Sequence, residues 1–112
     1  MSKVVRFHRT GGPEVLQLDD MQVSAPQADE VLLKINSIGL NRAEVMFRSG
    51  QYLETPELPA RLGYEASGII EQVGSNVSQF KTGDKVNVIP AFSMNQYGTY
   101  AEKAVLPVHA IV

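Results

Sequence analysis

The sequence predicts a mainly β fold: an antiparallel barrel that is partly open and carries one or two short helices. Short segments alternate apolar with polar residues at the period of a strand, and glycine and proline interrupt them repeatedly. Only one segment follows the period of a helix. Short strands joined by turns, with so little helix, are typical of closed or nearly closed antiparallel barrels.

The expected strands follow one another along the whole chain. The first ends before the Gly-Gly-Pro turn of residues 11–13, where glycine permits and proline enforces turn geometry. In the longest strand, residues 30–40, the odd-numbered side chains from Val31 to Ser37 are expected on one face. The extended segments are expected at residues 3–9, 15–23, 30–40, 66–73, 85–89, 98–105 and 108–112, with a loop at residues 51–61.

The one predicted helix covers residues 41–48. Asn41 is a suitable N-cap residue, because its short side chain can accept a hydrogen bond from the first turn. Gly50 is suited to the left-handed conformation that ends many helices. The apolar side of this helix is expected to hold Ala43, Met46 and Phe47, and the side in water to hold Arg42, Glu44 and Arg48.

Composition limits the classes of function. The 112 residues suit one domain, and 10 Lys and Arg interspersed with 12 Asp and Glu leave no basic stripe for nucleic acid. The absence of cysteine removes disulfides, thiolate nucleophiles and thiolate metal ligands. The first residues lack the apolar core of a signal peptide, and no apolar run reaches the roughly 18 residues of a membrane span. We therefore expect a cytoplasmic protein that binds neither nucleic acid nor membrane.

The end of the sequence suggests a truncated protein. The chain stops at Val112 inside an apolar strand pattern, where a polar end would be usual. It also contains no G-x-G-x-x-G that opens a helix in a βαβ unit. We expect residues 1–112 to form one domain and the dinucleotide-binding domain to be missing.

Five segments in order resemble the amino-terminal domain of the medium-chain dehydrogenase/reductase superfamily. They are GGPEVL at residues 11–16, GLN at 39–41, GYEASG at 63–68, GDKV at 83–86 and GTYAE at 98–102. Each is weak alone, but their order and spacing together are specific. The resemblance implies a GroES-like (chaperonin-10-like) domain over residues 1–112, of the zinc-free NADPH:quinone oxidoreductase type.

Two substitutions distinguish this sequence from the zinc-dependent branch of the superfamily. Asn41 and Tyr64 stand where that branch has a cysteine and a histidine ligand. A catalytic zinc site needs about three nitrogen, sulfur or carboxylate ligands and an open position. His8 and His109 lie at opposite ends of the chain and are expected to be strand residues. We therefore expect no metal site and no zinc.

The resemblance assigns candidate roles to five residues. Asn41 and Tyr52 are the catalytic and substrate-binding candidates, because an amide and a phenol can donate hydrogen bonds to a carbonyl oxygen that gains charge. Met46 and Tyr64 are further substrate-binding candidates, and Asn41 with Arg42 the cofactor-binding candidates. Structural roles remain open for each: a helix cap for Asn41, a packed loop ring for Tyr52, core positions for Met46 and Tyr64, and solvation for Arg42.

The resemblance implies that the full-length protein transfers hydride from NADPH to a quinone or a conjugated enone, as a homodimer. NADPH would be bound mainly by the missing domain, so the fragment alone should be inactive, and the substrate would be a small carbonyl compound. One alternative is a 2-alkenal or enoyl-thioester reductase, which uses the same kind of site. Another is a non-catalytic GroES-like module for binding or structure, because fold does not fix function.

Overall fold

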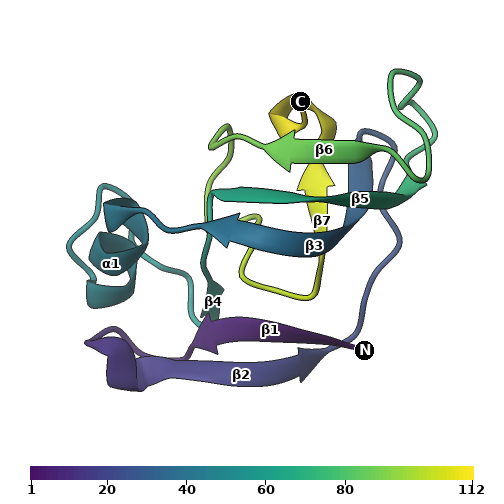
Figure 1. Cartoon of the computed structure of the whole chain (residues 1–112). Coiled ribbons are helices and arrows are strands. Elements are labelled where there is room, and N and C mark those ends of the chain that lie inside the picture. Colours follow the sequence, from purple (N-terminus) through teal and green to yellow (C-terminus); the bar gives the residue numbers. More distant parts are fainter.

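Two antiparallel sheets and one α-helix make up the computed structural model, which describes residues 1–112 (Figure 1). One sheet has the strand order β2-β1-β4 and the other the order β6-β5-β3-β7. The helix α1 (Arg42–Ser49) follows β3, and short 3-10 turns lie at Pro13–Val15 and Val108–Ala110. The strands are β1 (Ser2–Phe7), β2 (Leu16–Met21), β3 (Glu30–Gly39), β4 (Ala60–Arg61), β5 (Glu65–Val73), β6 (Lys85–Val88) and β7 (Lys103–Pro107).

The predicted mainly β, partly open arrangement is confirmed. A single isolated bridge, between Val4 and Ala101, connects the two sheets in the pairing pattern. Beside it the Val5 amide donates to the Tyr100 carbonyl at 2.9 Å, and the Glu102 amide donates to the Lys3 carbonyl at 3.0 Å. The pairing between β1 and the segment before β7 stops at this bridge, so the sheets do not close into a continuous barrel.

Two register shifts interrupt the long strand β3. Ile35 pairs with Gly68 of β5, but Ser37 pairs with the next residue, Ser67, so β3 advances by two residues against one. Such a bulge shifts the alternation of faces. The prediction of one face from Val31 to Ser37 was therefore wrong at its end, where the bulge takes Ser37 out of the alternation, and Ser37 is exposed.

Three predicted boundaries also differ from the structure. Residues 108–112 form a 3-10 turn with a bridge at Ile111, not a strand, although Ala110 and Ile111 are buried there. β7 begins only at Lys103, and β4 lies in what was predicted as loop. Apolar residues can be buried in a turn as well as in a strand, and a two-residue strand is too short to show a period.

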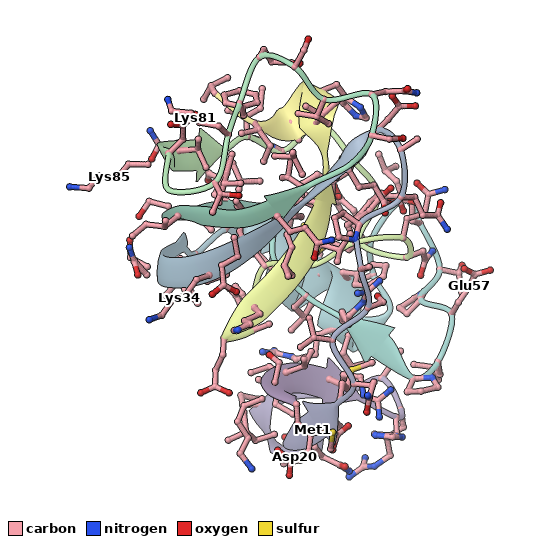
Figure 2. All side chains as sticks on the ribbon, turned by 90° about the vertical axis from the view of Figure 1, so that its right-hand side faces the viewer. Met1, Asp20, Lys34, Glu57, Lys81 and Lys85 are labelled. Carbon is pink, nitrogen blue, oxygen red and sulfur yellow. The ribbon has the colours of Figure 1, made fainter.

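Two apolar clusters form the interior. One lies on the four-stranded sheet and includes the fully buried Leu33, Ile70 and Leu106. The other includes Phe7 of β1 and Phe47 of α1, whose rings meet edge to face with centroids 5.8 Å apart. The charged side chains of Asp20, Lys34, Glu57, Lys81 and Lys85 project from the surface (Figure 2). The second cluster therefore fixes α1 on the three-stranded sheet.

α1, the one α-helix of the chain, falls short of the length and apolar character that spanning a bilayer requires.

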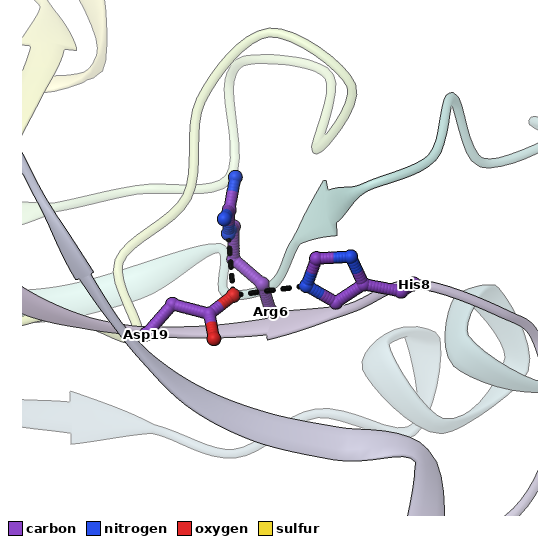
Figure 3. Close-up of polar contacts among 3 residues, drawn as sticks. All are labelled: Arg6, His8 and Asp19. Atoms are coloured by element: carbon purple, nitrogen blue, oxygen red, sulfur yellow. Dashed lines mark hydrogen bonds and ion pairs between the residues drawn. The ribbon is translucent and has the colours of Figure 1, made fainter.

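Asp19 of β2 holds Arg6 of β1 and His8, which follows β1 directly (Figure 3). Its Oδ2 accepts a hydrogen bond from Arg6 Nε at 2.8 Å and lies 3.0 Å from His8 Nε2. Two hydrogen bonds hold the pKa of Asp19 below its ordinary 3.8: the one with His8 has the larger effect and the one with Arg6 the smaller. The ionised carboxylate thus stabilises the β1–β2 pair.

We predict that Asp19→Asn lowers stability at neutral pH and that the difference from the wild type narrows as the pH falls below 3.8. A group with a lowered pKa stabilises the fold above its unfolded-state pKa and loses that contribution on protonation. Urea denaturation between pH 7 and pH 3 measures the difference. Asp29→Asn, which removes an exposed carboxylate without an ion pair, is the control and should leave the stability at neutral pH close to that of the wild type.

Candidate functional site

The N-terminus of α1 is held by a capping box. Asn41 is the N-cap residue, and its backbone amide donates to Glu44 Oε1 at 2.8 Å. At the other end Gly50 has a φ of 82°, the left-handed conformation that glycine adopts without a steric penalty. The predicted end residues Asn41 and Gly50 are confirmed, and the helix itself runs one residue later than the predicted 41–48. The capping box fixes Asn41 at the point where β3 passes into the helix.

Glu44 was expected in water, and this expectation was wrong: the residue is only 3% exposed. Its Oε1 also accepts a hydrogen bond from the Tyr100 hydroxyl at 2.7 Å, while its Oε2 is buried without a partner. Burial and this hydrogen bond raise the pKa of Tyr100 above its ordinary value. The Asn-x-x-Glu spacing could have predicted the hydrogen bond between Asn41 and Glu44. It could not have predicted the bond with Tyr100, which is 56 residues away in the sequence.

A hollow of about 390 Å³ lies beside this helix end, and three candidate residues line it: Asn41, Arg42 and Met46. Met46 is 36% exposed, so it is a wall of the hollow and the interpretation as a core residue was wrong. Leu40 and Val45 add exposed apolar surface to the same lining. The Asn41 side-chain nitrogen Nδ2 is buried and has no hydrogen-bond partner.

The two candidate tyrosines lie elsewhere and bond to each other. The hydroxyls of Tyr52 and Tyr64 are 3.1 Å apart, and neither residue lines the hollow beside Asn41. Tyr52 packs edge-on against Phe47 of α1, with ring centroids 6.2 Å apart. Tyr64 is 8% exposed, and burial, followed by the hydrogen bond with Tyr52, raises its pKa. Tyr64 therefore occupies a core position, the structural role left open for it, and its hydroxyl has a hydrogen-bond partner.

The residues at the zinc-ligand positions do not fit a zinc site. Asn41 offers an amide there, and the Tyr64 hydroxyl already bonds to Tyr52. No group of three histidine, aspartate or glutamate side chains gathers anywhere in the chain. His8 contacts Asp19, and His109 contacts a backbone carbonyl. A tetrahedral catalytic zinc needs about three protein ligands, so we derive no chemical step through this metal.

The hollow combines apolar walls with an unpaired donor. Its exposed apolar side chains suit a hydrophobic ligand, and the buried amide nitrogen of Asn41, which lines it, is a donor that a carbonyl oxygen could accept from. Arg42 is exposed at the same edge and can meet an anionic group. The arrangement can therefore orient a carbonyl compound. Its one hydroxyl, that of Ser49, donates to the Met46 carbonyl, and no histidine or carboxylate lines the hollow to activate it.

Two antiparallel sheets in a partly open barrel, with a capped helix beside a hollow, define a GroES-like domain. The chain belongs to the alcohol dehydrogenase GroES-like domain family, whose model matches residues 27–112. The family resemblance carried by the five sequence segments is confirmed.

Quinone oxidoreductases are among the most similar proteins. The rat quinone oxidoreductase is 44% identical over 105 residues, which are 93% of this chain and 31% of that protein. The human one is 40% identical over 112 residues, covering 99% of this chain and 33% of that protein. The chain thus spans about a third of the length of these relatives.

Solved structures agree with this placement. The quinone oxidoreductase of Pseudomonas syringae pv. Tomato DC3000 superposes with a TM-score of 0.91 and 39% identity, over 100% of this chain and 33% of that one. The Escherichia coli quinone oxidoreductase complexed with NADPH gives a TM-score of 0.84 and 32% identity, over 98% of this chain and 32% of that one.

Proposed function

We propose that this chain is the substrate-side domain of a longer, zinc-independent oxidoreductase that transfers hydride from NADPH to a quinone or a conjugated enone. The similarity to quinone oxidoreductases supports this, including one solved with NADPH, and so does the coverage of about a third of their length. When bound, NADPH supplies the hydride. A dinucleotide-binding domain outside this chain provides most of the NADPH site.

One observation carries the role of this chain: the unpaired, buried Nδ2 of Asn41. A buried donor without a partner costs about 1–3 kcal/mol, a cost that a ligand can remove by accepting its hydrogen bond. In the proposal the amide turns toward the hollow that Asn41 lines and donates to the substrate carbonyl oxygen. The bond strengthens as negative charge develops on that oxygen, which favours the transition state over the bound substrate.

In the proposal, other side chains make the remaining contacts with the substrate and the cofactor. Met46 forms an apolar wall against the substrate ring, and Arg42 at the edge meets a phosphate or ribose of the cofactor. Either hydroxyl of the Tyr52–Tyr64 pair can be the donor. Where Tyr64 donates, the Tyr52 proton is left free for a hydrogen bond to a part of the substrate that extends beyond the hollow lined by Asn41. The raised pKa of Tyr64 is consistent with a hydroxyl that stays protonated.

The intact protein, dialysed against a metal chelator, is expected to oxidise NADPH when 1,4-benzoquinone is supplied. The donors of this chain are an amide and phenols, which need no metal to stabilise the reduced oxygen. The decrease of NADPH absorbance measures the rate before and after chelation. Complete loss of activity on chelation, restored by added zinc, would contradict the zinc-independent mechanism.

A further inference from the structure

A second, smaller cavity lies where the start of β1 and the end of β2 meet β7 and the residues just before it. Its volume is about 60 Å³, and it shares no lining residue with the hollow beside Asn41. Arg61 of β4 and Lys103 of β7 are its basic lining residues, and no acidic residue lines it. A few water molecules or one small anion can be accommodated in a cavity of this size.

Arg61 differs from the basic residues around it because it has no carboxylate partner. Its one hydrogen bond is from Nη2 to the carbonyl of Gln96 at 2.5 Å, and no ion pair involves it. A guanidinium has five N–H donors, so most of its capacity remains unused by protein groups. The neighbouring pairs join Lys3 to Asp20 at 2.7 Å, Arg6 to Asp19 at 2.8 Å and Lys103 to Glu71 at 3.0 Å.

The surroundings disfavour the positive charge of Arg61. The residue is half-buried, and in the register of β1 and β4 it pairs directly with Arg6. Burial, followed by repulsion from Arg6, lowers the pKa of Arg61. Asp19 is already shared between Arg6 and His8, so it does not offset this charge. An anion beside Arg61 would relieve both the repulsion and the lost hydration.

Local geometry leaves space for such an anion. Gly98 lines the cavity, and a Cβ at this position would come within 2.9 Å of Arg61 Cβ and 2.7 Å of the Leu62 carbonyl oxygen. A side chain there would therefore compete with that of Arg61 for room. Ser24, an exposed residue, also lines the cavity, and its hydroxyl can donate a hydrogen bond.

A carboxylate lies in the adjoining hollow of about 240 Å³, which Arg61 and Ser24 also line. This is Glu30, which accepts hydrogen bonds from the Tyr97 hydroxyl at 2.6 Å and from the Gln27 amide at 2.9 Å. Because its negative charge would repel an anion, the smaller cavity, which lacks Glu30, is the favourable side of Arg61.

We propose that Arg61 and the cavity beside it bind a small oxyanion of the phosphate or sulfate class. The guanidinium would hold two of the anion's oxygens with a pair of parallel hydrogen bonds, the geometry for which arginine is suited. Because this cavity is separate from the hollow beside Asn41, the site is independent of the proposed reductase activity.

Titration of the intact protein with inorganic phosphate at constant ionic strength tests the proposal. The Arg61 Nε–H signal in a ¹H–¹⁵N spectrum is expected to shift and to saturate in the millimolar range, whereas chloride should leave it in place. The phosphate should also raise the unfolding temperature at these low concentrations, since it binds only the folded state. General stabilisation by phosphate appears only at far higher concentrations and does not saturate.

Two variants at 10 mM phosphate distinguish a site from a general effect. Arg61→Gln should abolish the saturable rise in unfolding temperature, and Arg9→Gln, which removes an exposed arginine outside both cavities, should retain it. An unchanged Arg61 signal in the wild type, or an equal response of both variants to phosphate, overturns the proposal. The wild-type titration decides the question even if Arg61→Gln does not fold.

Discussion

Asn41→Ser is expected to lower the kcat/KM of the intact enzyme for 1,4-benzoquinone about 100-fold, the usual cost of removing one donor to a developing oxyanion. Serine is as good an N-cap residue as asparagine, so α1 should keep its start. The variant removes the amide nitrogen that is buried without a partner and leaves the capping position filled. Steady-state kinetics with thermal unfolding of the same samples separate the two effects.

The matched control is Asn76→Ser, the same chemical change in an exposed turn after β5. It should leave both rate and stability close to those of the wild type. If Asn41→Ser also kept full activity, the amide would have no role beyond capping, and the proposed carbonyl contact would be wrong. A fall in stability without a fall in rate would lead to the same conclusion.

Phe47→Ala should reduce the free energy of unfolding by about 3–5 kcal/mol, the range for an aromatic side chain removed from a packed core. Phe47 is fully buried and packs edge to face against Phe7 and Tyr52, at centroid distances of 5.8 and 6.2 Å. The change would free α1 from the three-stranded sheet and displace Asn41 with it. Urea denaturation measures the loss, and the same samples should show reduced turnover.

Val45→Ala is the comparison for this second experiment. Val45 lies in the same helix but is 48% exposed, so its truncation should cost well under 1 kcal/mol apart from any change in the hollow. Equal losses for the two variants would mean that helix propensity, not the contact with the core, holds α1 in place. The contrast therefore tests whether the aromatic cluster positions the site.

Local patterns predicted the helix and the residues at its start. Asn41 and Gly50 follow from capping chemistry, whereas Met46 became a site candidate through the family resemblance, and the structure places Asn41 and Met46 together on one hollow. These features depend on residues within a few positions of one another. The short strands and turns also predicted an antiparallel, partly open barrel, and the family resemblance added its GroES-like identity, since several short strands alone do not determine how they pair.

Features that depend on distant partners were not predicted. Glu44 is a charged residue on a short helix and was therefore expected to face solvent. In the structure it is buried and accepts a hydrogen bond from the Tyr100 hydroxyl. Tyr52 and Tyr64 were expected near the same cleft, but nothing local shows that their hydroxyls meet each other. The bulge after Ile35 likewise depends on the register with β5, which the alternation within one strand does not contain.

The join between the two sheets has a consequence for the order in which the chain folds during its synthesis. The β1–β2 hairpin can pair as soon as residue 21 has left the ribosome. By contrast, the Lys3 amide bonds the Glu102 side chain and the Lys103 amide bonds the Ser2 hydroxyl, across separations of 99 and 101 residues. Contacts this far apart in sequence form slowly, because a long loop must close first. β1 is thus the first strand to be synthesised, but its contacts with the region around residues 102 and 103 are among the last to form.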